Sequence, residues 1–198
     1  MSKSDMIYNF VNEKINLLQT GSPWSKAMLA KLRRGVGKNP SDVPDVWDVT
    51  LNRFPEELTG FEESGDFIAN EAEMAVHVAL TIFALHQQGN QTSVNSYNRS
   101  FATSIRNLIN SDKSNENAIK RRFDAIITAD ALLELSTHAR GLVQLMKSSE
   151  NTSFNYPLFA KDLYAFQYSD GQKRVRLQWG LDFYRMRMNE TMEKEKII

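Results

Sequence analysis

Clusters of arginine and lysine are the residues of this sequence best suited to chemistry, because they can bind phosphate. One cluster lies in residues 31–40, KLRRGVGKNP, where Arg33 and Arg34 precede a Gly-Val-Gly-Lys loop ending at Lys38. Guanidinium forks beside a flexible backbone suit phosphate contacts. The segment is not a Walker loop, which follows a strand and has four residues between its glycines before Gly-Lys-Ser/Thr. The alternative to phosphate binding is that these basic side chains only complement the dipole at the C-terminus of a helix.

A second and a third cluster lie further along the chain. Residues 118–146 carry Arg121 and Arg122 on a segment whose apolar residues must face the core, so the arginines point elsewhere. Arg140 follows on the next predicted helix. The third cluster, in residues 171–187, contains Lys173, Arg174, Arg176, Arg185 and Arg187.

The C-terminal segment has apolar residues on two sides of a helix at about 100° per residue. One side carries Val175, Trp179, Phe183 and Met186, and the nearly opposite side carries Leu177, Leu181, Tyr184 and Met188. This pattern predicts a helix packed between neighbours, with its arginines ordered in the seams. Gly180 lies on one seam, where a missing side chain would let a backbone or a phosphate approach. Pairing of these arginines with an acidic segment of the same chain is the alternative.

Two Glu/His pairs raise the possibility of a metal-dependent enzyme. The pairs are Glu73 with His77 and Glu134 with His138. Their spacing of four residues does not match carboxylate-bridged di-iron bundles, which use a Glu and a His three residues apart. Asp130 is predicted to be an N-cap, and Glu134 with His138 an ordinary polar pair on one helix face. His86 is predicted to be a satisfied polar residue near a helix end, so neither a metal, a cofactor nor catalysis is expected.

Opposite charges are segregated along the chain, although 24 basic and 24 acidic residues balance. Residues 26–38 contain five bases and no acid, whereas residues 42–73 contain ten acids and one base. Concentrated charge of one sign suggests a surface that meets phosphates or an acidic partner, although charge runs also occur on solvated helix faces. The role of the acidic segment stays open.

The composition excludes several classes of protein. There is no cysteine, which rules out disulfide scaffolds, zinc fingers and thiol nucleophiles. The first ten residues do not have the pattern of a signal peptide, and the apolar run 74–85 is about half of a membrane span. These features predict a soluble protein of the cytoplasm.

Sparse glycine and proline and the spacing of apolar residues predict an all-α fold, a compact bundle of about eight or nine helices. The first helix ends at Gly21, and Ser22 caps a second helix with Pro23 at its first position and Gly35 as a left-handed terminator. Further helices are predicted at about 44–53, 67–87, 94–109, 116–127, 130–147, 156–168 and 172–190. Residues 1–198 are expected to form one domain, either undivided or built from two packed halves at about 1–89 and 93–198.

In their order, these segments resemble the CasB family, the small subunit of the type I-E CRISPR complex Cascade. The likeness spans about residues 26–190 and rests on KLRRGVG (31–37), TIFALHQ (81–87), RRFDAIITAD (121–130), HARGLVQLM (138–146), YPLFAKDL (156–163) and VRLQWGLDFYR (175–185). The sequence departs from the family at Ala139, Phe166 and Leu181, where Leu, Trp and Arg are frequent. With leucine at 181, the phosphate contact that the resemblance would imply at this position is not expected.

The resemblance implies a non-catalytic subunit, present in two copies, that binds nucleic acid backbone without sequence specificity. Its expected partners are crRNA and target DNA, the large and backbone subunits of Cascade, and a second copy of itself. It would stabilise the R-loop and the displaced strand. The residues expected to contact nucleic acid are Arg33, Arg34, Lys38, Arg121, Arg122, Arg140, Lys173, Arg174 and Arg176. A helical module that docks acidic proteins without nucleic acid is the alternative.

Overall fold

Helix α1 (Lys3–Leu18) lies across the molecule and begins a succession of nine α-helices in the ranges that the structure describes. This computed structural model describes residues 1–60 and 69–195, with side chains as far as residue 184. The other helices are α2 (Pro23–Arg34), α3 (Trp47–Thr50), α4 (Glu71–Gln87), α5 (Phe101–Ser111), α6 (Glu116–Thr128), α7 (Leu132–Met146), α8 (Tyr156–Phe166) and α9 (Ser169–Glu195). The described ranges contain no strand, so the predicted all-α bundle is confirmed.

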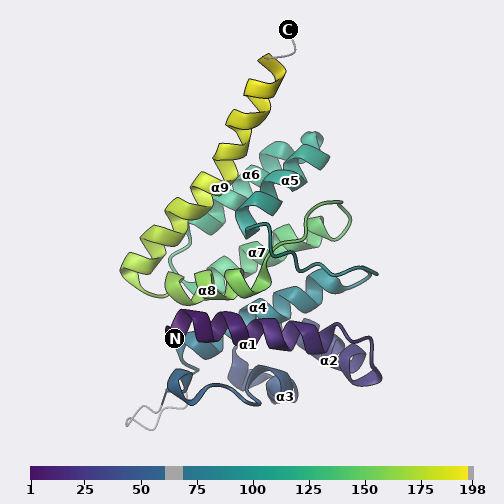
Figure 1. The fold of residues 1–198 in the computed structure, drawn as a ribbon, viewed down its shortest axis with the longest axis vertical. Coiled ribbons are helices and arrows are strands. Elements are labelled where there is room, and N and C mark those ends of the chain that lie inside the picture. The colour runs from purple at the N-terminus through teal and green to yellow at the C-terminus, as the bar shows by residue number, and fades with distance from the viewer. Residues whose placement is uncertain (61–68, 196–198) are drawn as a thin grey trace.

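The helices are arranged in levels along the long axis of the molecule (Figure 1). Helices α1, α2 and α3 occupy the lower end, α8 lies directly above α1, and α5, α6 and much of α9 occupy the upper end. Helix α4 packs against α2, α7 and α8, while α9 packs against α5 and α8. Because α8 touches both α1 and α9, it joins the two ends. The proposed division into two halves stays a prediction.

Helix starts follow the sequence signals closely. The side chain of Ser22 accepts a hydrogen bond from the backbone of Ser25, and Pro23 occupies the first turn of α2, as predicted. Asn70 and Glu73 form a reciprocal capping box at the start of α4, which satisfies free backbone N–H groups there. Gly35 does not have the predicted left-handed conformation, since its φ is −83°. Gly37 has it instead, with φ +79°.

Aromatic side chains from distant segments form much of the core between α5, α8 and α9. The ring of Phe101 lies 4.8 Å from that of Phe159 and 5.4 Å from that of Trp179. Phe154 and Tyr156 stack at 4.1 Å. Buried side chains of this size stabilise a fold by about 1.5–3 kcal/mol each, so this cluster anchors α9 to the bundle.

Several predicted helix boundaries are wrong for identifiable reasons. The helix predicted at 94–109 starts only at Phe101, because the preceding residues pair with the segment around Phe154: the Phe154 amide donates to the carbonyl of Val94 at 3.2 Å. The helix predicted at 44–53 is two short turns, the 3-10 turn Pro44–Val46 and α3. Residues 67 and 68, predicted to begin α4, lie outside the described residues.

Helices α7 and α9 also differ from the prediction at their starts. Helix α7 begins at Leu132, and its N-cap position is Ala131, so the predicted N-cap role of Asp130 is wrong. Helix α9 begins at Ser169, three residues earlier than predicted. Within the described ranges, no helix combines the length and apolar character needed to cross a bilayer.

Candidate nucleic-acid interface

The basic cluster on α2 lies beside part of the acidic segment. Arg34 and Lys38 are exposed and Arg33 is half-buried at the C-terminal end of α2. The guanidinium of Arg34 lies 3.3 Å from a carboxylate oxygen of Asp45, with both side chains largely in solvent. Such exposed pairs contribute little stability, so Arg34 can exchange this partner for another anion at small cost.

The glycines that follow Arg34 serve the fold in two different ways. A methyl group on Gly35 would lie 3.2 Å from Cγ2 of Thr81, so this glycine permits close packing of α2 against α4. Gly37 has no neighbour within 4 Å of that position, but its positive φ favours glycine. The loop therefore has a structural explanation that is independent of phosphate.

The basic residues of α6 and α7 come together where these helices pack. Arg121, Arg122 and Arg140 are all exposed. The side chain of Arg122 lies across Gly141, with Nε 3.7 Å from the place that a methyl group there would occupy. Arg122 therefore lies next to the helical turn that carries Arg140, and the two helices present these cations on adjoining surfaces.

The cations of α9 divide into exposed and structural ones. Lys173 and Arg174 are exposed, and Lys173 lies 3.6 Å from Asp170 in a fully solvated pair. Arg176 is different, because its guanidinium donates to the carbonyl of Ala129 at 2.7 Å and lies 3.2 Å from Asp130. Arg176 thus ties α9 to the loop between α6 and α7.

The prediction that α9 packs on two apolar faces is wrong in the described part of the helix. Val175, Trp179 and Phe183 are buried, whereas Leu177 is 66% and Tyr184 44% exposed on the other side. Met186, Met188, Arg185 and Arg187 lie beyond the described side chains. Because α9 has one buried face and one open surface, the side chain of Arg174 is less confined than it would be in a seam between two packed neighbours.

The nine predicted contact residues fall into two groups along the molecule. Helix α2 lies at the lower end in Figure 1, whereas α6 and most of α9 lie toward the upper end. Helix α6 packs against both α7 and α9. Lys173 and Arg174 lie in the first turns of α9, which begins beside α8, so the cations of these three helices are grouped by helix contact and not as one continuous face. We call Arg121, Arg122, Arg140, Lys173 and Arg174 the upper basic group.

The Glu and His residues of the metal hypothesis have other partners. Glu73 closes the capping box of α4, and His77 lies 3.3 Å from the carbonyl of Gly35. Glu134 accepts a hydrogen bond from the backbone N–H of Asp130 at 3.1 Å. Within residues 1–60 and 69–184, no three His, Asp or Glu side chains gather in a way that could hold a metal ion.

The buried histidines have hydrogen-bond partners, as predicted for His86. Its Nδ1 is hydrogen-bonded to the hydroxyl of Tyr156 at 3.0 Å, and burial lowers the pKa of His86 to about 4. Burial also lowers the pKa of His77. Both imidazoles are therefore neutral near pH 7 and add no charge to the basic groups.

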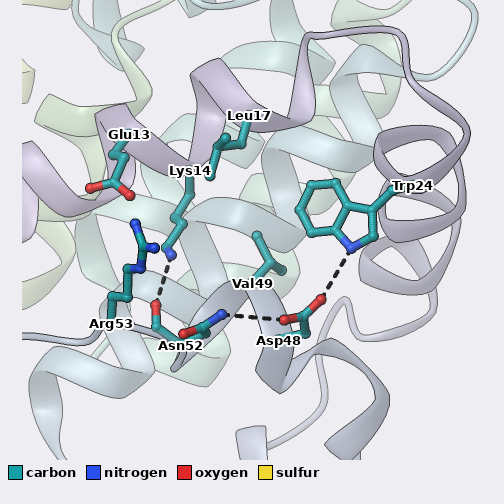
Figure 2. A pocket seen from close by; sticks show the side chains of 8 residues that line it. All are labelled: Glu13, Lys14, Leu17, Trp24, Asp48, Val49, Asn52 and Arg53. Carbon is teal, nitrogen blue, oxygen red and sulfur yellow. Dashed lines mark hydrogen bonds between the residues drawn. The ribbon is translucent and has the colours of Figure 1, made fainter.

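Two cations at the lower end are absent from the predicted set. Lys14 falls on the buried stripe of α1, three and four residues from Val11 and Phe10, a spacing that the sequence already contains. Arg53 is the one base within the acidic segment 42–73. Either feature of the sequence could have identified Lys14 and Arg53 as candidates. The structure places both residues in the lining of one pocket (Figure 2).

The comparisons with known proteins identify the family and the fold of this chain. The sequence model of the family described as CRISPR-associated protein Cse2 matches residues 28–184. CasB from Thermobifida fusca is similar in structure, with TM-score 0.72 and 27% identity over 90% of this chain and 98% of that one. CasB from M. ruber has TM-score 0.67 and 22% identity over 97% and 98% of the two chains. No curated protein sequence matches.

A third similar structure is a Cse2-family protein from Thermus thermophilus, with TM-score 0.65 and 17% identity over 93% of this chain and 99% of that one. At 17% and 22% identity, the Thermus thermophilus and M. ruber structures support the fold alone. The family match, by contrast, runs from within α2 to within α9 and contains all nine predicted contact residues. The chain belongs to the Cse2 family of CRISPR-associated proteins, to which its likeness to CasB pointed.

Proposed function

We propose that this chain is a non-catalytic subunit of Cascade that binds the nucleic acid backbone without sequence specificity and thereby stabilises the R-loop and the displaced strand. The observation that carries the proposal is the upper basic group. Among the described residues, Arg121, Arg122, Arg140 and Arg174 are exposed and form no ion pair. Exposed guanidinium groups without a carboxylate partner are available to phosphates.

Backbone contacts are sufficient for this task. Exchange of DNA pairing for RNA pairing is nearly neutral in free energy, so modest protein contacts to either backbone shift the balance toward the R-loop. The α2 cluster would add contacts at the other end of the same elongated molecule. Arg176 has mainly a structural role, because its guanidinium is already engaged by Ala129 and Asp130.

The partners in this proposal are crRNA and target DNA, the large and backbone subunits of Cascade, and a second copy of the chain, all in the cytoplasm. The acidic surface near Asp42 and Asp45 would repel phosphates and so face other subunits. The exposed apolar residues Leu177 and Tyr184 favour, as a second candidate, a module that docks proteins without nucleic acid. A pull-down with and without nuclease separates the two, since partners held by RNA or DNA are lost on nuclease treatment.

The direct test is filter binding of an oligothymidylate across a salt series. Affinity should fall linearly with salt on logarithmic axes, by about 0.7 in slope for each phosphate contact to a single strand. Replacement of Arg140 and Arg174 by Ala should reduce the slope by about 1.4. The matched control replaces Lys3 and Lys26, two exposed lysines at the lower end, and should change the slope less. A flat salt response of the unmodified protein would contradict the proposal.

A further inference from the structure

The side of α9 opposite its buried stripe combines apolar and basic side chains. Leu177 and Tyr184 are exposed there, and the space beside Gly180 is open. At about 100° per residue these positions fall within an arc of about 120°, centred opposite Trp179. The described part of the chain leaves this arc uncovered. We call its residues the outer face of α9: Lys173, Arg174, Leu177, Gly180, Leu181 and Tyr184.

Basic side chains lie at both ends of the outer face. Lys173 and Arg174 are exposed where α9 begins beside α8. At the other end lies Lys120 of α6, whose pKa is raised by hydrogen bonding to Asp124 and, to a smaller extent, to the hydroxyl of Tyr184. Positions 173 and 184 are about 16 Å apart along the helix axis, at about 1.5 Å per residue. A strand that follows the outer face therefore meets cations at both of its ends.

The Tyr184 ring is held by the residues beneath it. It meets the Phe183 ring edge-on, with 4.9 Å between the centroids, and Phe183 stacks on Phe123 of α6 at 4.1 Å. A ring that the fold already holds loses little side-chain entropy when a ligand stacks on it. Tyr184 is thus both accessible and ordered.

The acids near the outer face leave a cation available at its start. Asp170 and Asp124 are paired with the two lysines, at 3.6 Å and 2.8 Å. Asp182, the one acid in residues 173–184, lies toward α8, where burial and then the Asp182 charge raise the pKa of Asp162. Arg174 acts on Asp162 through its charge but forms no ion pair among the described residues. Its guanidinium can therefore accept a phosphate.

The size of the apolar part favours nucleic acid bases over a protein surface. A stable protein interface buries about 800 Å² on each partner, and three partly exposed apolar side chains supply far less. A base needs only one exposed ring, because its flat face stacks on aromatic side chains while nearby cations hold the phosphates. The bases of a duplex stack on one another, so only an unpaired strand can bring them to Tyr184 and Leu177.

We propose that the outer face of α9 binds an unpaired nucleic acid strand through its bases, with one base stacked on Tyr184 and another packed on Leu177. Phosphates of the same strand contact Arg174 at one end and Lys120 at the other. The bases are not distinguished, because each has a face that can stack. This inference rests on the proposed function and adds that the strand is unpaired and turns its bases toward the protein.

The test compares, by filter binding, an oligothymidylate of about ten nucleotides with an abasic strand that has the same number of phosphates. The oligothymidylate should bind about tenfold more tightly, and Tyr184→Ala should remove most of this difference. Tyr184→Ala should leave the salt slope unchanged, because no phosphate contact is lost, whereas Arg174→Ala should reduce it by about 0.7. Tyr184→Phe keeps the ring and should retain the tighter binding of the oligothymidylate.

The matched control is Tyr97→Ala, which removes another exposed ring, one whose hydroxyl donates to Asn12 of α1, and should leave both affinities unchanged. Equal affinities for the two strands, both falling steeply with salt, would overturn this inference and leave the proposed backbone binding intact. No binding of either strand would overturn both. If Tyr184→Ala keeps the preference for oligothymidylate but loses self-association in sedimentation, the outer face of α9 contacts a second copy of the chain and the inference is wrong.

Discussion

Trp179 of α9 donates a hydrogen bond from its indole Nε1 to Oδ2 of Asp162 in α8, across 2.7 Å. This bond connects the helix that carries Lys173 and Arg174 to the centre of the bundle. Burial raises the pKa of Asp162 to about 7 against an ordinary value of 3.8, and the negative charge of Asp182 adds to the rise while the Trp179 bond opposes it. The position of α9 is therefore coupled to a carboxyl group that titrates near neutral pH.

Replacement of Asp162 by Asn should stabilise the protein above pH 7. A raised native pKa means that the folded state holds more protons than the unfolded state between pH 4 and pH 7, so stability falls as pH rises through that window. Asn resembles the protonated form and still accepts from Trp179. Allowing for partial solvent exposure, we expect about 1–2 kcal/mol at pH 8.

Urea unfolding of both proteins from pH 4 to pH 8 measures this difference directly. The two stabilities should converge near pH 4, where Asp162 is protonated in the folded state and largely protonated in the unfolded chain. The same difference at pH 4 and at pH 8 would show that Asp162 is ionised throughout and that the indole bond dominates its pKa.

Arg176 and Arg174 should respond differently to the same substitution. Arg176→Ala leaves the carbonyl of Ala129 without its donor and removes a guanidinium 5.8 Å from the ring centre of Phe166, so we expect a loss of about 1–3 kcal/mol. Arg174→Ala should change stability by less than about 0.5 kcal/mol, because the residue is exposed. In filter binding the order of the two effects should reverse, because Arg174→Ala reduces the salt slope more than Arg176→Ala does. Equal melting temperatures for the two variants would contradict the structural role of Arg176.

Gly171 and Gly180 form a matched pair on α9. A methyl group on Gly171 would lie 2.0 Å from the backbone oxygen of Ala165, so Gly171→Ala must displace α8 or α9 and should destabilise strongly, by more than about 3 kcal/mol. Gly180 has no neighbour within 4 Å of that position. Gly180→Ala should stabilise the helix by about 0.5–1 kcal/mol in thermal unfolding.

Gly180→Ala also tests whether a phosphate approaches the backbone of α9 at this position. If a phosphate does, the variant will be more stable and will still bind an oligothymidylate less tightly. Unchanged affinity in the stabilised variant would assign Gly180 no contact with the strand.

The sequence alone predicted the helices well where local signals decide, and failed where distant segments compete. Ser22 and Pro23 start α2 as local capping chemistry requires. The segment beginning at Val94 has an apolar pattern that fits a helix, but its backbone pairs with Phe154, about sixty residues away, and no local pattern reports such a partner. The prediction of a second packed face on α9 was wrong for a related reason. Periodicity places Leu177 on a face of the helix but does not show whether a neighbouring element covers that face.

The candidate site was predictable by residue type but not by pairing. All nine predicted residues are at least partly accessible, because charged side chains rarely lose water without a partner. The sequence could not show that Arg176 binds Ala129 or that Arg34 lies beside Asp45, since both contacts depend on how separate segments pack. Lys14 lies on the otherwise apolar stripe of α1, and the stripe pattern alone does not show which atoms its ammonium contacts.

Removal of the Asp45 carboxylate should strengthen nucleic acid binding at the α2 cluster. Asp45→Ala releases Arg34 from its ion pair at 3.3 Å and removes one charge that repels phosphate. We expect affinity for an oligothymidylate at low salt to rise about threefold, with a steeper salt slope as Arg34 gains a phosphate contact. Asp42→Ala is the matched control, because it removes the same charge from an exposed residue that forms no ion pair within the described part of the chain. Equal gains in affinity from both substitutions would attribute the effect to net charge. A gain specific to Asp45→Ala that disappears when Arg34 is also replaced would instead identify Arg34 as a phosphate contact that its ion pair with Asp45 restrains.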